Sequence, residues 1–219
     1  MFRNLERVAV FTYSHAAMPD ELDPDAALML RVKQGDAAAF TELVEKYKQP
    51  IFNLVWRTVR DETEAEDIAQ NVFVQAWKSA PRYQATAKFS TWIFTIARNL
   101  CLNEFRRRNR HPAESLDQTR DDSEDQPLFQ IEDKRTAGVQ DQLLQGELEA
   151  KVDAALAALP ENQRVALALC REEVLSYEEI AAVLGCSVSA TKSLIHRARE
   201  TIKVRLKPYL KSGAWEADK

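Results

Sequence analysis

The chain has 219 residues, which is enough for one medium domain or two small ones and too few for a large catalytic barrel. Hydrophobic residues make up 45% and charged residues 29%, with only five glycines and eight prolines, which excludes a collagenous or wholly disordered protein. The net charge of -4 conceals two basic stretches, 82–111 and 187–211, each with seven basic residues against one acid. Between them, 113–150 carries eleven acids against three bases. Two basic surfaces joined by an acidic segment suggest a polyanion bound at two places, although solvated helix faces are the alternative.

The sequence shows neither a membrane span nor a signal peptide, and this suggests where the protein is located in the cell. No run approaches the roughly 18 apolar residues of a membrane span, and the first 20 residues do not follow the order of a signal peptide. We therefore expect a cytoplasmic protein without membrane insertion. The three cysteines, Cys101, Cys170 and Cys186, form no C-x-x-C pair, so we interpret each as a small buried apolar residue.

Helical periodicity begins after a segment, 1–24, that we expect to be a poorly ordered N-terminal extension. Apolar residues then recur at three- and four-residue spacing over about 26–32, 40–59, 65–77 and 89–105. Pro50 predicts a kink in the second helix, and Thr63 with Glu66 predicts a capping box at the start of the third. This pattern predicts a four-helix domain from 25 to 111.

The rest of the chain predicts a linker and a second helical domain. Segment 112–146 is acidic and poor in large apolar residues, so we expect it to be a flexible linker. Helical patterns follow over about 148–159, 160–169, 177–184 and 188–206, which defines a second domain at 147–210 and a tail at 211–219. No strand pattern competes, so the fold class is all-α with two small domains.

The most specific local pattern is a helix-turn-helix over 175–196. Ser176 with Glu179 predicts a capping box, and Gly185 supplies the backbone conformation of the tight turn. The second helix then directs an outer face toward a DNA major groove, consisting of Ser189, Lys192, Ser193, His196 and Arg197. The alternative is an ordinary helical hairpin with a solvated basic face.

Aromatic and basic residues occur together over 89–108, after a loop that contains Tyr83. Unstacked bases stack on aromatic rings while neighbouring cations bind the phosphates, so this composition is typical of a single-strand binding surface. Taken alone, Phe89, Trp92 and Phe94 are more often residues of a simple core, and we expect Trp92 to be at least partly buried. The acidic helix at 61–77 is by itself typical of a solvated face.

Taken in this order, the motifs resemble those of the bacterial sigma factors of the extracytoplasmic-function group, which contain sigma domains 2 and 4 only. The resemblance rests on A-E-D-I-A-Q-N-V-F at 65–73, F-S-T-W-I-F-T-I-A-R-N at 89–99 and the helix-turn-helix, and it covers 25–111 and about 147–210. It implies a protein that binds core RNA polymerase, directs it to promoters and helps to open the DNA.

The resemblance also implies roles for individual residues. The residues expected to bind core polymerase are Asp67, Gln70 and Asn71, where Asn71 replaces the usual Glu. The residues expected to bind the minus-ten element are Tyr83, Lys88, Trp92, Arg98, Asn99, Asn103, Arg106 and Arg107. The face formed by Ser189, Lys192, Ser193, His196 and Arg197 is expected to bind the minus-thirty-five element, with Leu194 where the family commonly has Arg.

The same resemblance implies no catalysis, no cofactor, no metal, no small-molecule substrate and an anti-sigma factor as a further partner. The chain has no Gly-rich phosphate loop or nucleophile motif. One alternative is a conventional helix-turn-helix regulator that does not replace a polymerase subunit. A metal-dependent hydrolase is the other, and its only histidines would be His15, His111 and His196, which lie far apart in sequence.

Overall fold

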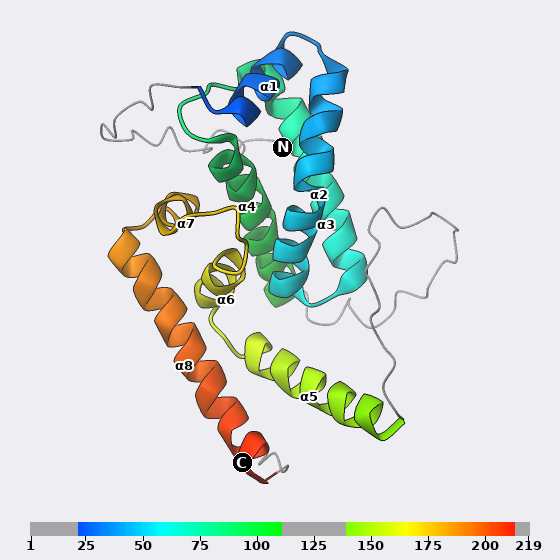
Figure 1. Ribbon diagram of the computed structural model, residues 1–219, viewed down its shortest axis with the longest axis vertical. Helices are drawn as coiled ribbons and strands as arrows, with labels where there is room; N and C mark the ends of the chain where they lie inside the picture. The colour runs from blue at the N-terminus through cyan, green and yellow to red at the C-terminus, as the bar shows by residue number, and fades with distance from the viewer. Residues whose placement is uncertain (1–21, 111–138, 213–219) are drawn as a thin grey trace.

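The computed structural model describes residues 22–110 and 139–212, which contain eight α-helices, one 3₁₀ turn and no strand (Figure 1). The predicted all-α class is therefore confirmed for this part of the chain. The predicted extension at 1–24, linker at 112–146 and tail at 211–219 lie largely outside the described residues. The helices are α1 (Pro24–Lys33), α2 (Ala37–Val59), α3 (Glu62–Ser79), α4 (Phe89–Arg110), α5 (Val139–Ala157), α6 (Glu161–Leu169), α7 (Tyr177–Leu184) and α8 (Val188–Ser212).

Aspartate side chains cap the N-termini of α2 and α3 in the N-terminal half of the chain, which contains α1 to α4. The Asp36 side chain accepts a hydrogen bond from the backbone N–H of Ala39 at the start of α2. Asp61 accepts from the N–H of Glu64 at the start of α3, so the predicted N-cap at Thr63 is wrong by two residues. An aspartate carboxylate satisfies the same free N–H groups as threonine would. Pro50 lies inside α2, and the helix continues through it.

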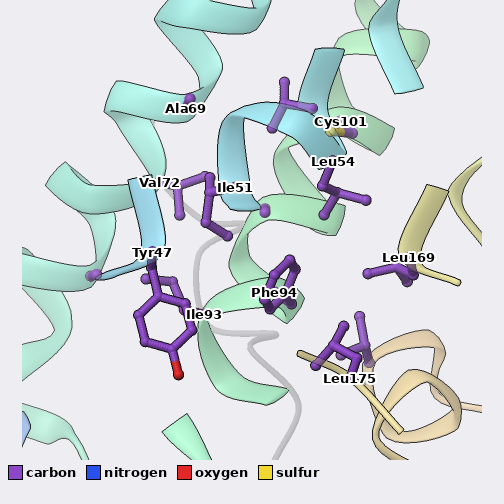
Figure 2. Close-up of a cluster of buried hydrophobic side chains, with 14 of the residues drawn as sticks. Tyr47, Ile51, Leu54, Ala69, Val72, Ile93, Phe94, Cys101, Leu169 and Leu175 are labelled. Carbon is purple, nitrogen blue, oxygen red and sulfur yellow. The ribbon is translucent and has the colours of Figure 1, made fainter. Parts of the chain in front are cut away.

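The core of the N-terminal half is built from α2, α3 and α4, which lie side by side (Figure 1). Ile51 and Leu54 of α2, Val72 of α3, and Ile93 and Phe94 of α4 are completely or almost completely buried (Figure 2). These side chains recur at the spacing of one helix face, and their burial is the main source of stability for such a bundle.

An aromatic cluster orients the start of α4 against α2. The Tyr47 ring packs edge-to-face on Phe89 with a centroid distance of 5.2 Å. Its hydroxyl donates to the buried carboxylate of Asp25, which also accepts from the Lys46 ammonium at 2.7 Å. Burial is the largest cause that raises the pKa of Tyr47, and the hydrogen bond to Asp25 adds to it. A buried carboxylate thus connects α1 to α2 with its hydrogen bonds satisfied.

The C-terminal half contains α5 to α8, and two boundaries differ from those predicted. α5 begins at Val139, inside the segment predicted to be linker, and α8 extends to Ser212 rather than about 206. The start of α5 is rich in Gln and acids and continues the acidic composition of the preceding segment, so it was predicted to belong to the linker. The predicted start of the second domain at 147 therefore falls inside a helix.

The two halves share one hydrophobic core. Leu169 of α6 and Leu175, between α6 and α7, belong to the same buried cluster as Leu54 and Phe94, and Figure 2 shows all four in one view. α6 packs on α2 and α4, and α7 packs on α4. The sequence predicted two domains joined by a linker, but it did not predict this direct contact.

Ion pairs surround the shared core. Arg57 of α2 pairs with Glu172, whose side chain is only 6% exposed, and Arg60 pairs with Asp153 of α5. Lys88, just before α4, pairs with Glu179 of α7 at 3.0 Å. Burial, which outweighs the influence of Arg57, raises the pKa of Glu172. Each pair joins the N-terminal half of the chain to the C-terminal half.

We predict that Phe94→Ala destabilises the protein by about 3–5 kcal/mol, because Phe94 is fully buried in the core common to both halves. Urea unfolding followed by circular dichroism would measure this loss. Val74→Ala on the exposed face of α3 is the matched control, with an expected change below about 0.5 kcal/mol. A loss for Phe94→Ala as small as that of the control would contradict the assignment of Phe94 to the core.

Candidate nucleic-acid interface

The helix-turn-helix is formed by α7, a short turn and α8. The Ser176 hydroxyl accepts from the N–H of Glu179, and the Glu179 side chain accepts from the N–H of Ser176, which confirms the predicted capping box. Gly185 has φ of 68° at the C-terminus of α7, where a residue with a side chain would be strained. The geometry of the turn therefore agrees with the prediction.

The first half of α8 separates an inner from an outer face. Thr191, Ile195 and Ala198 are buried, whereas Val188 and Ile202 are half-buried. The five residues predicted to face DNA are all exposed: Ser189, Lys192, Ser193, His196 and Arg197. The Ser193 hydroxyl donates to the Ser189 carbonyl at 3.0 Å, within the helix. This face presents two cations, an imidazole and two hydroxyls, which suits contacts to phosphates and base edges.

Tyr177, the first residue of α7, is an unpredicted neighbour of this face. The Lys192 ammonium lies 5.6 Å from the centre of the Tyr177 ring, a cation–π geometry. The Tyr177 hydroxyl is 3.8 Å from the Cys170 sulfur, which also accepts from Arg199 at 3.5 Å. The contact with Cys170 is the largest cause that raises the pKa of Tyr177. The ring thus gives Lys192 a preferred position.

The loop before α4 is closed by aromatic packing. Tyr83 is only 3% exposed, and its ring packs edge-to-face on Trp92 at 5.0 Å between centroids. The Lys33 ammonium donates to the Tyr83 carbonyl at 2.9 Å. Trp92 is half-buried, as expected, and tilts against Phe89. Because Tyr83 is buried, a direct contact between its ring and DNA would require this loop to rearrange, and that contact stays a prediction.

The outer face of α4 carries the predicted asparagines. Asn99 and Asn103 are exposed and lie one turn apart. Arg106 donates to the Asn103 side-chain oxygen at 2.9 Å, and Arg98 lies 3.4 Å from that of Asn99. Arg98 is half-buried, and burial is the largest cause that lowers its pKa. Exposed amides beside guanidinium groups can bind both a base edge and a phosphate.

A buried carboxylate organises the basic end of α4, and sequence reasoning missed it. Glu104 is 6% exposed and accepts from Arg107 at 2.7 Å and from Arg108 at 2.7 Å. Arg107 also reaches Glu64 of α3 at 3.2 Å. Burial alone would raise the pKa of Glu104, but the hydrogen bonds from the two arginines outweigh it and lower the pKa. The signal in the sequence was a lone acid inside the Arg-rich run.

The outer face of α3 combines polar and apolar groups. Asp67, Gln70 and Asn71, predicted to bind core polymerase, are all exposed. On the same helix Val74 and Trp77 are each 45% exposed. The Trp77 ring packs edge-to-face on Phe40 at 4.9 Å, which keeps it in place. Exposed apolar side chains beside polar ones are typical of a protein-binding surface.

The described residues contain no group of three or more potential metal ligands and no helix long and apolar enough to cross a membrane. Across 22–110 and 139–212, the candidate binding surfaces are three exposed helix faces, on α3, α4 and α8. With the helix-turn-helix geometry, they are typical of a helical protein that binds DNA and another protein.

Comparison with known protein families identifies which kind of DNA-binding protein this chain resembles. Residues 43–111 match the family described as Sigma-70 region 2, and residues 149–202 match Sigma-70, region 4. The chain is 39% identical over 195 residues to the RNA polymerase sigma-H factor of Pseudomonas aeruginosa, covering 87% of this chain and 98% of that protein. It is 31% identical over 194 residues to the ECF RNA polymerase sigma-E factor of Escherichia coli strain K12, with coverage of 85% and 96%.

Solved structures show the same fold. The structure of CnrH in complex with the cytosolic domain of CnrY matches with a TM-score of 0.61 and 24% identity, covering 85% of this chain and 99% of that chain. The sigma factor RpoE of Bartonella quintana, in complex with the anti-sigma factor NepR, matches with a TM-score of 0.56 and 24% identity, with coverage of 77% and 96%.

The chain belongs to the extracytoplasmic-function (ECF) family of RNA polymerase sigma factors. It directs RNA polymerase to promoters and is not an enzyme. A conventional helix-turn-helix regulator would not account for the match to region 2, and neither a regulator nor a hydrolase would account for both matches in one chain. The family suggested by the sequence motifs is thereby confirmed.

The cysteines give a test of the fold that is independent of DNA. Cys101 is fully buried, and burial raises its pKa to about 12, whereas Cys170 and Cys186 are only half-buried, so the prediction of burial holds for one of three. We predict that a thiol reagent modifies Cys170 and Cys186 at neutral pH and leaves Cys101 unmodified until the protein unfolds. Peptide mass spectrometry would locate the label, and fast labelling of Cys101 in the native protein would contradict the packing of α4.

Proposed function

We propose that the two halves of the chain bind different elements of the promoter. The N-terminal half, 25–111, binds core polymerase and the minus-ten element, and the C-terminal half, 147–210, binds the minus-thirty-five element. The observation that supports this most strongly is the joint occurrence of regions 2 and 4 with exposed polar faces on α3, α4 and α8. Run-off transcription with purified core polymerase tests the function directly. A linear promoter template should yield a run-off transcript only when this chain is added.

The proposed duplex contact is made by the outer face of α8. Lys192 and Arg197 supply the charge, His196, Ser189 and Ser193 can donate or accept hydrogen bonds, and all five side chains are free of the core. A recognition helix places the residues of its first turns at base edges in the major groove. The cation–π contact with Tyr177 orients Lys192 before DNA arrives, which lowers the entropy lost on binding.

The proposed single-strand contact is made by α4 and the loop before it. Asn99 and Asn103 present amides that can donate to and accept from a base edge, and Arg106 supplies charge beside them. Capturing an extruded base makes strand opening favourable, because the bound state compensates part of the cost of unstacking. The ring of Trp92 is half-buried, so its exposed part is a candidate surface for stacking of an unpaired base.

The proposed polymerase contact is made by the outer face of α3. Asp67, Gln70 and Asn71 provide polar contacts, and Val74 and Trp77 lie exposed on the same helix. Buried aromatic anchors contribute strongly to protein interfaces, so Trp77 is the candidate for the largest single contribution. Since polymerase acts in the cytoplasm, we place this protein in the cytoplasm too.

We also propose that an anti-sigma factor binds this chain. Two structurally similar proteins, CnrH and the sigma factor RpoE, are each seen with a protein partner, the cytosolic domain of CnrY and the anti-sigma factor NepR respectively. The proposed partner would cover the polar faces of both halves, and it would compete with polymerase and promoter. Affinity capture of the full chain from its native cells, followed by competition with core polymerase, would test this.

We predict that Lys192→Ala or Arg197→Ala weakens promoter binding by the holoenzyme. A lost base contact should cost about 1–3 kcal/mol and relax preference at one position, whereas a lost phosphate contact should mainly reduce the salt dependence. Lys207→Ala, an exposed lysine about 22 Å farther along α8, is the matched control. Equal promoter affinity in all three variants and the wild type would contradict a reading role for this face.

We predict that Asn99→Ala impairs promoter opening more than promoter binding. The extruded base would lose a hydrogen-bond partner, so part of the few kcal/mol that compensates unstacking disappears. Permanganate footprinting would measure opening, and a gel-shift assay would measure binding. A template with a pre-melted minus-ten bubble is the control, and it should restore most of the transcript. If the bubble brings no recovery in a variant with wild-type thermal stability, Asn99 does not act on the unpaired base.

A further inference from the structure

The loop before α4 is tied at both ends to α1, a helix that lies outside the residues matched by the region 2 family. At the first end, the ammonium of Lys33, in the last turn of α1, donates to the Tyr83 carbonyl at 2.9 Å. At the second end, the N–H of Phe89, which begins α4, donates to the carboxylate of Asp23 at 2.7 Å. One helix thus holds the backbone on both sides of the loop over 84–88.

The Asp23 side chain is directed away from the helix that it precedes. Asp23 occupies the N-cap position of α1, where an aspartate usually accepts from an N–H of its own helix, but its side chain makes no such bond. The carboxylate lies instead at the N-terminus of α4, whose first turn contains no acidic residue. There it satisfies an N–H that has no partner within the helix, and it interacts favourably with the helix dipole. Asp23 therefore stabilises the start of α4 rather than that of α1.

α1 itself is held firmly against the bundle. Met29 is completely buried, and Asp25 accepts hydrogen bonds from Lys46 and Tyr47 of α2. The helix also lies against the start of α4 and against the 3₁₀ turn Ala80–Arg82, which leads into the loop (Figure 1). Because α1 is fixed on α2, the ends of the loop can shift relative to the bundle only if a hydrogen bond to α1 breaks.

The loop exposes side chains between two buried aromatic residues. Tyr83 and Phe89 are buried with their ring centres 6.4 Å apart, whereas Gln84, Thr86 and Lys88 are exposed. The Tyr83 hydroxyl has no hydrogen-bond partner in the part of the chain that the structure describes, so the polar tie of Tyr83 to α1 is made by its carbonyl. Exposed polar groups on a fixed backbone lose less conformational entropy when a ligand binds.

We propose that Asp23 and Lys33 are positioning residues for the capture of the unpaired strand, because they hold the loop over 84–88 in place beside α4. The inference rests on the proposed role of this loop and α4 at the minus-ten element. Neither residue has to contact DNA. When one end of the loop is released, the apparent affinity for the unpaired strand falls by the fraction of molecules in which the loop is still in place. The duplex contact of α8 does not use the loop and should be unchanged.

Substitutions at the two ends of α1 separate positioning from charge. D23A and K33A each release one end of the loop. In the conservative variants D23N and K33R, the asparagine oxygen can still accept from the Phe89 N–H, and arginine can still donate to the Tyr83 carbonyl. R31A is the matched control, because it removes a cation of the same helix that pairs with Asp36 instead of the loop. Lys33 is exposed, so K33A keeps the test valid if D23A fails to fold.

Opening and binding are measured separately with the holoenzyme on the linear promoter template. Permanganate footprinting gives the ratio of open to closed complexes, and a gel shift at low temperature gives the affinity for the closed promoter. We expect the ratio to fall about fivefold in D23A and about twofold in K33A, with less than a twofold change in closed-promoter affinity. D23N, K33R and R31A should resemble the wild type. A wild-type ratio in both alanine variants, or an equal loss in R31A, would overturn the proposal.

A second measurement uses the free chain without DNA. Amide hydrogen exchange over 89–92, at the start of α4, should be about fivefold faster in D23A than in D23N, while the core amides of α2 stay as slow as in the wild type. Equal exchange over 89–92 in the two variants would overturn the proposal as well. Run-off transcription by wild-type holoenzyme distinguishes the two levels. Without a transcript the proposed function fails, and the positioning roles fail with it. A normal transcript, combined with a wild-type ratio of open to closed complexes in D23A and K33A, refutes only the positioning by α1.

Discussion

The burial of one face of α4 is the constraint on which the other features of this structure depend. Phe89, Ile93, Phe94 and Ala97 are completely buried, so the helix has a single possible orientation against α2 and α3. Asn99, Asn103 and Arg106 must then point away from the bundle. The same core continues into Leu169 and Leu175 of the C-terminal half, which also determines where α7 can lie. The apolar packing of α4 therefore orients the proposed DNA contacts and also determines the position of α7.

Periodicity predicted most of this helical framework because it reports which side chains are removed from water. The exposure of the outer face of α8 and the capping box of α7 were predicted correctly, since both depend on neighbours within one or two helical turns. The predicted N-cap at Thr63 was wrong because Asp61 offers the same chemistry two residues earlier. The start of α5 at Val139 was missed because its first residues share the acidic, Gln-rich composition of the segment before them, which is typical of a linker.

Contacts between distant residues could not be predicted in this way. Arg57 and Glu172 are 115 positions apart, and neither lies in a motif. The charge pattern of the sequence correctly separated basic from acidic segments, but it overstated how many cations are available to a polyanion. Lys88, Arg107 and Arg108 each have a carboxylate partner within the protein. Arg106 and Lys192, in contrast, contact an amide oxygen and an aromatic ring, which leaves their charge uncompensated at that contact.

The carboxylates of α4 and α7 show two ways in which an acid can serve a nucleic-acid surface. Glu104 is buried, and breaking its pairs with Arg107 and Arg108 would leave a charge without a partner in the protein interior. Glu104 therefore keeps the guanidinium groups of Arg107 and Arg108 in fixed positions at the C-terminal end of α4. Glu179 instead pairs with one ammonium, that of Lys88, while its other oxygen accepts the cap hydrogen bond of α7. Both acids are largely buried and both meet a cation that is about 60% exposed, so the two sites differ in the number of charged partners, two arginines for Glu104 and one lysine for Glu179.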